Sequence, residues 1–441
     1  MTTDAPARND KRTIFGWAMY DWANSAYITI FGAVIGAFFT GTIMTGDTYW
    51  GMSGEALFAI LIGIGSIILM LAMPVLGAVA DYTDAKRRFM RNFAFIGAAF
   101  AILIAFVPDG MVPLFLLVVV VSQFGFVAAN VFYDGFLPEI ATDDTVDQVS
   151  SKGFALGYLG GGIYLLFALV LIMFSSDEPD AFLTETLAAR IAIFGSGIWW
   201  IVFSLVSLAR LPSDGSHTRS RSISDYVSIG FDRTIKTTRK LREFPQLLIF
   251  VVAFVIYNSG IGTVIAVSGP YAEDTLSLEL ETIALAFLIV QFIAFFGATL
   301  LGMLANRIGP KQSVVLTLVV WVGVAVAAYF LPEGGSASFL ALAAVIGFVL
   351  GGVQALSRSL YASMIPEEAS AEFFGFYSVF SKLSGIGPLV FGLVSAATGS
   401  GRTAILSIAL FFIIGLVMLV RVDVDEARAS RDRWDFESAA G

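Results

Sequence analysis

The stretch ALFAILIGIGSIILMLAMPVLGAVA, Ala56 to Ala80, contains no charged residue in 25 positions. About 20 consecutive apolar residues are enough for an α-helix to cross a bilayer. The whole chain has a similar character, because hydrophobic residues make up 57% of its 441 residues and charged residues only 14%. A soluble domain carries about 25% charged residues. The composition therefore predicts an all-α membrane protein with many spanning helices.

We expect twelve membrane spans, and the distribution of basic residues supports this number. With the N-terminus inside, the inner loops and tails hold 22 of the 26 Lys and Arg residues, and the outer connections hold essentially only Arg402. This asymmetry is what the positive-inside rule requires, so both termini are expected in the cytoplasm. The expected spans lie near residues 14–39, 56–80, 92–108, 112–138, 153–174, 187–210, 246–272, 282–305, 312–331, 338–365, 373–398 and 403–421.

A polar stretch from Pro212 to Pro245 divides the chain into two halves. We expect residues 1–211 and 246–422 each to form a six-helix bundle, joined by the cytoplasmic linker 212–245 and followed by a cytoplasmic tail, 423–441. The second part of the linker has apolar residues at near-helical spacing with five basic residues between them. That pattern is typical of an amphipathic helix on the anionic inner leaflet, and a purely mechanical linker is the alternative.

The two halves repeat each other at matching places. GAVADYTDAKRR (Gly77–Arg88) follows the second span, and GMLANRIGPK (Gly302–Lys311) follows the eighth. FLPEI (Phe136–Ile140) ends the fourth span, and MIPEE (Met364–Glu368) ends the tenth. Two parallel six-helix repeats are typical of many secondary transporters.

The loops after the second and eighth spans resemble the signature loop of the major facilitator superfamily. In the second copy Asn306 replaces the usual Asp, and in the first copy Asp84 replaces the expected Gly. The resemblance implies that these loops take part in gating, and it gives a set of candidate gating residues: Gly77, Asp81, Lys86, Arg87, Arg88, Gly302, Arg307 and Lys311.

A narrower resemblance covers nearly the whole chain. FGWAMYDWANSAY, FYDGFLPEIA, SKGFALGYLGGG, GGVQALSRSLYASMIP and AEFFGFYSVFSKLSGIGP resemble segments of the vacuole-effluxer family, which includes autophagy-linked vacuolar amino-acid exporters of fungi. The resemblance implies the major facilitator fold, in which helices 1, 4, 7 and 10 line the central cavity and helix 11 lies between the halves. It also implies a transporter, with amino acids as substrates in the fungal branch.

Four charged residues lie well inside the expected spans: Asp21 and Asp134 in the first half, and Arg358 and Lys382 in the second. Each costs roughly 2.5–3.5 kcal/mol near the bilayer centre. They should therefore face a wet cavity or each other. Acids on one bundle and bases on the other would suit a gate between the bundles, and the alternative is local pairing of Asp134 with Lys86, Arg87 or Arg88.

Polar residues share helix faces with these charges. Asp21, Asn24 and Ser25 are spaced i, i+3, i+4, and similar spacing links Asn130 to Asp134 and Gln354 to Arg358. A polar cavity lining is one interpretation, and hydrogen bonds between helices, worth about 0.6 kcal/mol each, are the other. The candidate residues for substrate binding or coupling are Asp21, Asn24, Asn130, Asp134, Gln354, Arg358 and Lys382.

The sequence favours secondary active transport of a small polar solute, with amino acids as one candidate and proton or sodium coupling left open. Cysteine is absent and the single histidine, His217, lies in the linker, so we expect no metal site, cofactor or enzymatic activity. We expect a monomer among membrane lipids, with no nucleic-acid partner, in a bacterial cytoplasmic (inner) membrane. The alternatives are a lipid or amphiphile transporter on the same fold and a non-transporting sensor or scaffold.

The topology is open to a direct test, because the chain has no native cysteine. A thiol reagent that cannot cross the membrane should label Ser336→Cys from outside intact cells and should leave Ser216→Cys unlabelled. The opposite labelling pattern would invert the orientation.

Overall fold

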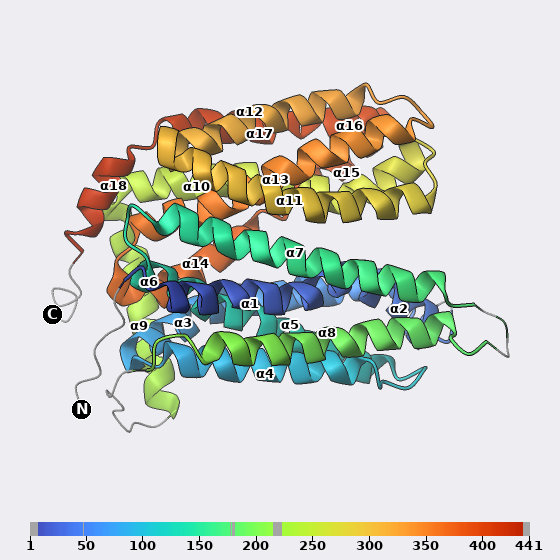
Figure 1. The fold of residues 1–441 in the computed structure, drawn as a ribbon, viewed down its shortest axis with the longest axis horizontal. Helices are drawn as coiled ribbons and strands as arrows, with labels where there is room; N and C mark the ends of the chain where they lie inside the picture. The colour runs from blue at the N-terminus through green and yellow to red at the C-terminus, as the bar shows by residue number, and fades with distance from the viewer. Residues whose placement is uncertain (1–7, 47, 177, 179–180, 215–222, 435–441) are drawn as a thin grey trace.

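The computed structural model describes residues 8–46, 48–176, 178, 181–214 and 223–434 and consists of α-helices joined by short connections (Figure 1). The expected all-α membrane fold is confirmed. Part of the linker, with Ser216 and His217, lies outside the described residues, as does the end of the tail beyond Trp434.

Eight α-helices and two π-helical turns make up the described part of the first half. They are α1 (Lys11–Ile30), η1 (Phe31–Ile35), α2 (Gly36–Phe38), η2 (Phe39–Ile43), α3 (Gly54–Thr83), α4 (Lys86–Ile104), α5 (Val112–Gly135), α6 (Leu137–Ile140), α7 (Val146–Met173) and α8 (Glu185–Leu208); a ninth α-helix, α9 (Ile223–Lys240), with the 3-10 turn η3 (Leu241–Glu243), forms the described part of the linker.

The second half continues the same pattern. Its elements are α10 (Pro245–Pro270), η4 (Tyr271–Thr275), α11 (Leu280–Ile308), α12 (Pro310–Tyr329), α13 (Ser336–Met364), η5 (Glu367–Ala369), α14 (Ser370–Leu383), α15 (Ile386–Thr398), α16 (Gly401–Ser407), α17 (Ala409–Val420) and α18 (Val424–Arg431).

Within the described residues, eleven helical segments are long and apolar enough to cross a membrane. The expected span 92–108 corresponds to α4, which begins earlier, at Lys86, and carries Arg87, Arg88 and Arg91 in its first turns. Because of these charges, α4 is not among the eleven apolar segments. Its 19 residues still extend about 28 Å at 1.5 Å per residue, close to the thickness of a hydrocarbon core. Counting α4, the helices supply the twelve spans.

One expected span is broken. Residues 373–398 form two helices, α14 and α15, with the break at Ser384 and Gly385. Pro388 explains its position, because a proline lacks the backbone N–H that would bond to the carbonyl four residues earlier, that of Ser384, and its ring crowds that carbonyl.

The helices form two bundles (Figure 1). In this view α1, α3, α4, α5 and α8 lie below, and α11, α12, α13 and α17 lie above. Two helices close the seam between the bundles: α7 packs against α11 and α13, and α14 packs against α3 and α5. The short helices α6 and α18 and the linker helix α9 lie at one end of the molecule, which we call the linker end.

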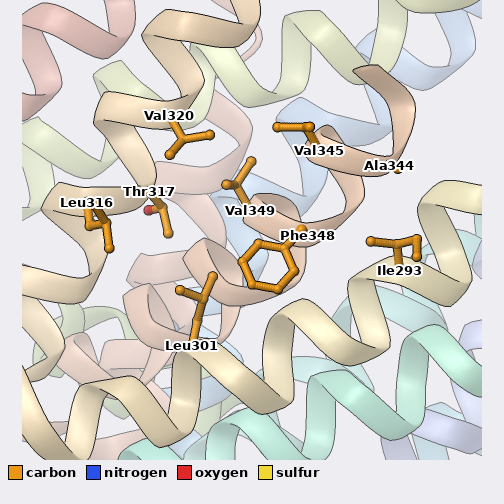
Figure 2. Close-up of a pocket in the computed structure, with 9 residues that line it drawn as sticks. All are labelled: Ile293, Leu301, Leu316, Thr317, Val320, Ala344, Val345, Phe348 and Val349. Atoms are coloured by element: carbon orange, nitrogen blue, oxygen red, sulfur yellow. The ribbon is translucent and has the colours of Figure 1, made fainter. Parts of the chain in front are cut away.

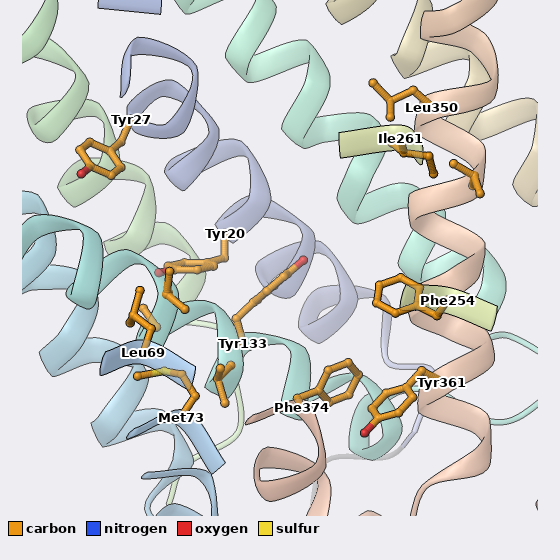
Figure 3. Close-up of a cluster of buried hydrophobic side chains, with 14 of the residues drawn as sticks. Tyr20, Tyr27, Leu69, Met73, Tyr133, Phe254, Ile261, Leu350, Tyr361 and Phe374 are labelled. Carbon is orange, nitrogen blue, oxygen red and sulfur yellow. The ribbon is translucent and has the colours of Figure 1, made fainter. Parts of the chain in front are cut away.

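The buried core joins the bundles through aromatic side chains (Figure 3). Tyr20 and Tyr133 belong to the first half, and Phe254, Tyr361 and Phe374 belong to the second. By contrast, α3 exposes Ile64, Ile67 and Leu71 on its surface. Apolar exposure on this scale along a helix fits contact with lipid and not with water.

Candidate functional site

Arg358 on α13 extends from the second half into the first and contacts both intramembrane acids. Its Nη2 lies 3.2 Å from Oδ2 of Asp21 on α1, and its Nη1 lies 3.0 Å from Oδ1 of Asp134 on α5. Arg358 is only 3% exposed. One guanidinium is therefore held between two carboxylates of the opposite bundle, and we call these three residues the Arg358 cluster.

The rest of the guanidinium is also surrounded. Its Nε donates to the hydroxyl of Ser150 at 3.0 Å, and its Nη2 donates to the carbonyl oxygen of Ser150 at 3.0 Å. The rings of Phe154 and Trp17 lie 4.2 Å and 4.8 Å from its central carbon. Cation–π contacts of this kind favour a charged guanidinium where water is excluded.

Asp21 is positioned by its aromatic neighbours. The hydroxyl of Tyr133 donates to Oδ2 of Asp21 at 2.7 Å, and the indole N–H of Trp17 donates to the carbonyl oxygen of Tyr133 at 2.8 Å. The Trp17 and Tyr133 rings stack with their centroids 4.5 Å apart. When both acids are ionised, the Arg358 cluster carries one excess negative charge.

This geometry decides between the two pairings that the sequence left open for Asp134. The local alternative is wrong, because Lys86 pairs with Asp81 and Glu139, and Arg88 lies 3.8 Å from Asp214. The guanidinium of Arg87 donates to the carbonyl oxygen of Leu208, and its backbone N–H donates to Asp214 at 2.8 Å.

The polar residues near the cluster make hydrogen bonds between helices. Asn24 on α1 donates to Asn130 on α5 at 2.8 Å and is only 4% exposed, so its side chain bonds a neighbouring helix and does not line an open space. Tyr158 on α7 donates to Gln354 on α13, across the seam. Asn130 and Gln354 stay partly exposed.

Lys382 lies apart from the cluster, which corrects the expectation that it would join a gate with the acids. Among the described ion pairs none includes Lys382, and its side chain lines a pocket of about 160 Å³ with Ile28, Phe31 and Gln123. Lys382 and the acids lie at different positions along the helix axes. Ile28 follows Asp21 by seven residues, so Lys382 lies roughly 10 Å farther along α1 from the linker end.

Near the linker end, Asp81 connects the end of α3 to the start of α14. It accepts backbone N–H groups from Glu372 at 2.8 Å and from Ala371 at 3.3 Å. These donors belong to the first turn of α14, where the helix dipole favours a negative charge. Glycines let the backbones meet there, since a Cβ at Gly375 would lie 2.6 Å from the Met73 carbonyl oxygen.

Lys86 completes this contact. Its ammonium is buried, lies 3.2 Å from Asp81, pairs with Glu139 and donates to Ser370 of α14 at 2.6 Å. Lys86 therefore joins Asp81 and Glu139 of the first half to the start of α14 in the second half.

The repeated loop in the second half does not cross the seam in the same way. Lys311 donates to the carbonyl oxygens of Val420 at 2.9 Å and Val422 at 2.7 Å, both in its own half. Arg307 is exposed and forms no ion pair with another of the described residues. Gly302 packs against Ser151 of α7, in the first half.

Several contacts across the seam could not be predicted from the sequence. Arg233 of the linker helix lies 2.8 Å from Glu372 of α14, and Arg431 of α18 lies 3.0 Å from Asp143 in the first half. Asp147 of α7 accepts a hydrogen bond from Ser359 of α13. The position of Glu372 in the segment AEFFGFYSVF was a signal, since it places an acid at the start of a span.

A second pocket, between α11, α12 and α13, is apolar. Figure 2 shows its lining, in which Phe348, Val349 and Leu301 lie close together and Thr317 is the one polar residue among the nine. All nine residues belong to the second half. The pocket is therefore a poor candidate for binding a polar solute.

Comparisons with known proteins agree with this architecture. The family model described as "Vacuole effluxer Atg22 like" matches residues 48–432. The chain is 31% identical over 409 residues to the uncharacterized MFS-type transporter YxiO of Bacillus subtilis, covering 92% of this chain and 94% of YxiO. It is 28% identical over 310 residues to autophagy-related protein 22 of Cryptococcus neoformans, covering 66% of this chain and 55% of that protein.

A solved structure shares the fold. The human organic anion transporter MFSD10 (TETRAN) superposes with a TM-score of 0.69 over 93% of this chain and 99% of its own, at 14% sequence identity. An identity this low shows the fold alone.

We predict that Asp81→Asn keeps the fold but opens the linker end more often, because it weakens both the contact with the α14 dipole and the pair with Lys86. Ser151→Cys gives a readout, because Ser151 is 3% exposed and its hydroxyl makes no hydrogen bond in the described structure. Asp81→Asn should speed thiol labelling at this position roughly three- to thirty-fold, as expected for a loss of about 0.7–2 kcal/mol.

The matched control is Asp84→Asn, three residues on. Asp84 is exposed, ends α3 in the left-handed conformation that Asn also accepts, and should leave the labelling rate unchanged. Equal rates for the two variants would contradict a gating role for Asp81.

Proposed function

The chain belongs to the Atg22-like vacuole effluxer family of the major facilitator superfamily, and on that basis we propose that it is a secondary active transporter of a small polar solute. Family and fold are those of a membrane transporter. The proposed mechanism is alternating access, in which the two bundles rock about a central binding site. Its setting is a bacterial cytoplasmic membrane with both termini inside, as the positive-inside rule favours.

One observation carries this proposal: a buried arginine of one bundle is held by two acids of the other. When the bundles separate at the linker end, these ion pairs must break. A site that loses its internal base then needs another cation. A proton, a sodium ion or the ammonium group of the solute could each take the place of the guanidinium.

The charged side chains inside the membrane support the proposal that the solute is polar. The excess negative charge lies at the Arg358 cluster, while Lys382 lies farther along the seam and has no ion pair among the described residues. A solute with both signs of charge would fit this separation, with its ammonium group toward Asp134 and its anionic group toward Lys382. Amino acids belong to this class, and the resemblance to fungal exporters makes them the first solutes to test.

We predict that Asp21→Asn abolishes gradient-driven accumulation but preserves exchange, if Asp21 carries the coupling cation. Exchange needs solute binding but no net cation movement. Purified protein in proteoliposomes, with radiolabelled amino acids inside or outside, measures both. Asp274→Asn, which removes an exposed carboxylate from η4, should change neither rate. Loss of exchange and accumulation together in Asp21→Asn would contradict this role.

Arg358→Ala should lose both activities and about 3–5 kcal/mol of stability, because it leaves two partly buried carboxylates without a base. Denaturant unfolding in detergent measures the stability. Combining Arg358→Met with Asp21→Asn and Asp134→Asn should recover most of the stability and none of the transport. Recovery of transport in this neutral variant would show that the Arg358 cluster is only structural.

A further inference from the structure

The linker helix α9 lies against the membrane-spanning part of the protein and not beyond it. A Cβ added at Gly230 would lie 2.9 Å from Cγ1 of Val75 and 2.8 Å from Cγ2 of Val79 on α3. These valines precede the end of α3 at Thr83 by eight and four residues, which is roughly 12 and 6 Å of helix. An interfacial helix lies at this depth, where head groups meet acyl chains.

The inner face of α9 also contacts the opposite half. Arg233 pairs at 2.8 Å with Glu372 of α14, whose side chain is completely buried. Thr237, one turn later, is 3% exposed. Since α3 and α14 belong to different bundles, α9 bridges the seam and must release one of them when the linker end opens.

The outer face of α9 has a different composition. Phe231 and Ile235, one turn apart, are 53% and 46% exposed. Arg239 continues the same side of α9, Arg242 follows in η3, and both are exposed. An apolar pair followed by two guanidinium groups matches a membrane surface, where the ring and the aliphatic chain enter the acyl region and the guanidinium groups meet phosphates.

The charges of α9 and η3 favour an anionic surface. Residues 223–243 contain five basic side chains and three acidic ones, Asp225, Asp232 and Glu243. Asp232 precedes Lys236 by one turn, so the two offset each other, and Arg233 is paired with Glu372. The net positive charge therefore lies at the C-terminal part of the helix, next to the exposed apolar pair.

We propose that the outer face of α9 binds anionic phospholipid head groups, and that the bound lipid holds α9 against α3 and α14 and so favours the closed linker end. A ligand that binds the docked helix more tightly than the released helix shifts the population toward the docked state. The inference goes beyond solute transport and holds for any solute.

The test uses Ser151→Cys protein in nanodiscs of phosphatidylcholine alone or of phosphatidylcholine mixed with phosphatidylglycerol. Thiol labelling should be slower in the anionic nanodiscs, by roughly fivefold for each contributing basic residue. Arg239→Gln combined with Arg242→Gln should remove this dependence. Lys11→Gln combined with Arg12→Gln is the matched control, because it removes two exposed bases elsewhere near the linker end and should keep the dependence.

Equal labelling in the two lipids would overturn the proposal, and so would equal loss of the lipid effect in both double variants. A second measurement does not depend on gating: a nitroxide at Ile235→Cys should collide with oxygen in the membrane more than with a water-soluble nickel chelate. A nitroxide freely reached by the chelate would place the outer face of α9 in water and overturn the lipid site. Neither readout requires transport, so their failure leaves the proposed transport function standing.

Discussion

The structure depends on a single electrostatic requirement: the guanidinium of Arg358 cannot be buried in a membrane protein without acids near it. Its two acids come from the other half of the chain, on α1 and α5. The ion pairs therefore hold the bundles together at one depth along the seam. Trp17 and Tyr133 stack beside the cluster and exclude water, which strengthens these charge interactions.

Closure of the linker end is concentrated on the first turns of α14. Asp81 accepts two of its backbone N–H groups, Lys86 bonds Ser370, and Arg233 pairs with Glu372. Where α7 faces α13, hydrogen bonds join the two bundles, such as the one that the Ser150 hydroxyl donates to the Ala355 carbonyl oxygen at 2.7 Å. The two signature loops thus make different contacts although they are similar in sequence, because Asp81 of the first loop bonds the opposite bundle while Lys311 of the second bonds its own half.

Hydropathy, the basic-residue distribution and the internal repeat predicted the fold, since each depends on the membrane as a solvent and not on tertiary detail. The break in α14–α15 and the early start of α4 were missed, because they depend on Pro388 and on charges in a first turn. Opposite charges in the two halves pointed to Arg358 beside Asp21 and Asp134. The ion pair of Arg233 with Glu372 could not be predicted, since nothing in the local sequence indicates which helix the linker contacts. Lys382 was placed too close to the acids, because the sequence does not show how far along the membrane axis one helix is shifted against another.

We propose that the Arg358 cluster holds the linker end closed. The most direct measurement is the distance between nitroxides at Lys152→Cys on α7 and Arg307→Cys on α11, two exposed positions on opposite bundles, by double electron–electron resonance. Replacing Arg358 by Met should shift the distance distribution toward longer values, because the two acids then lose the base that draws α13 toward them. An unchanged distribution in a folded Arg358→Met protein would contradict it.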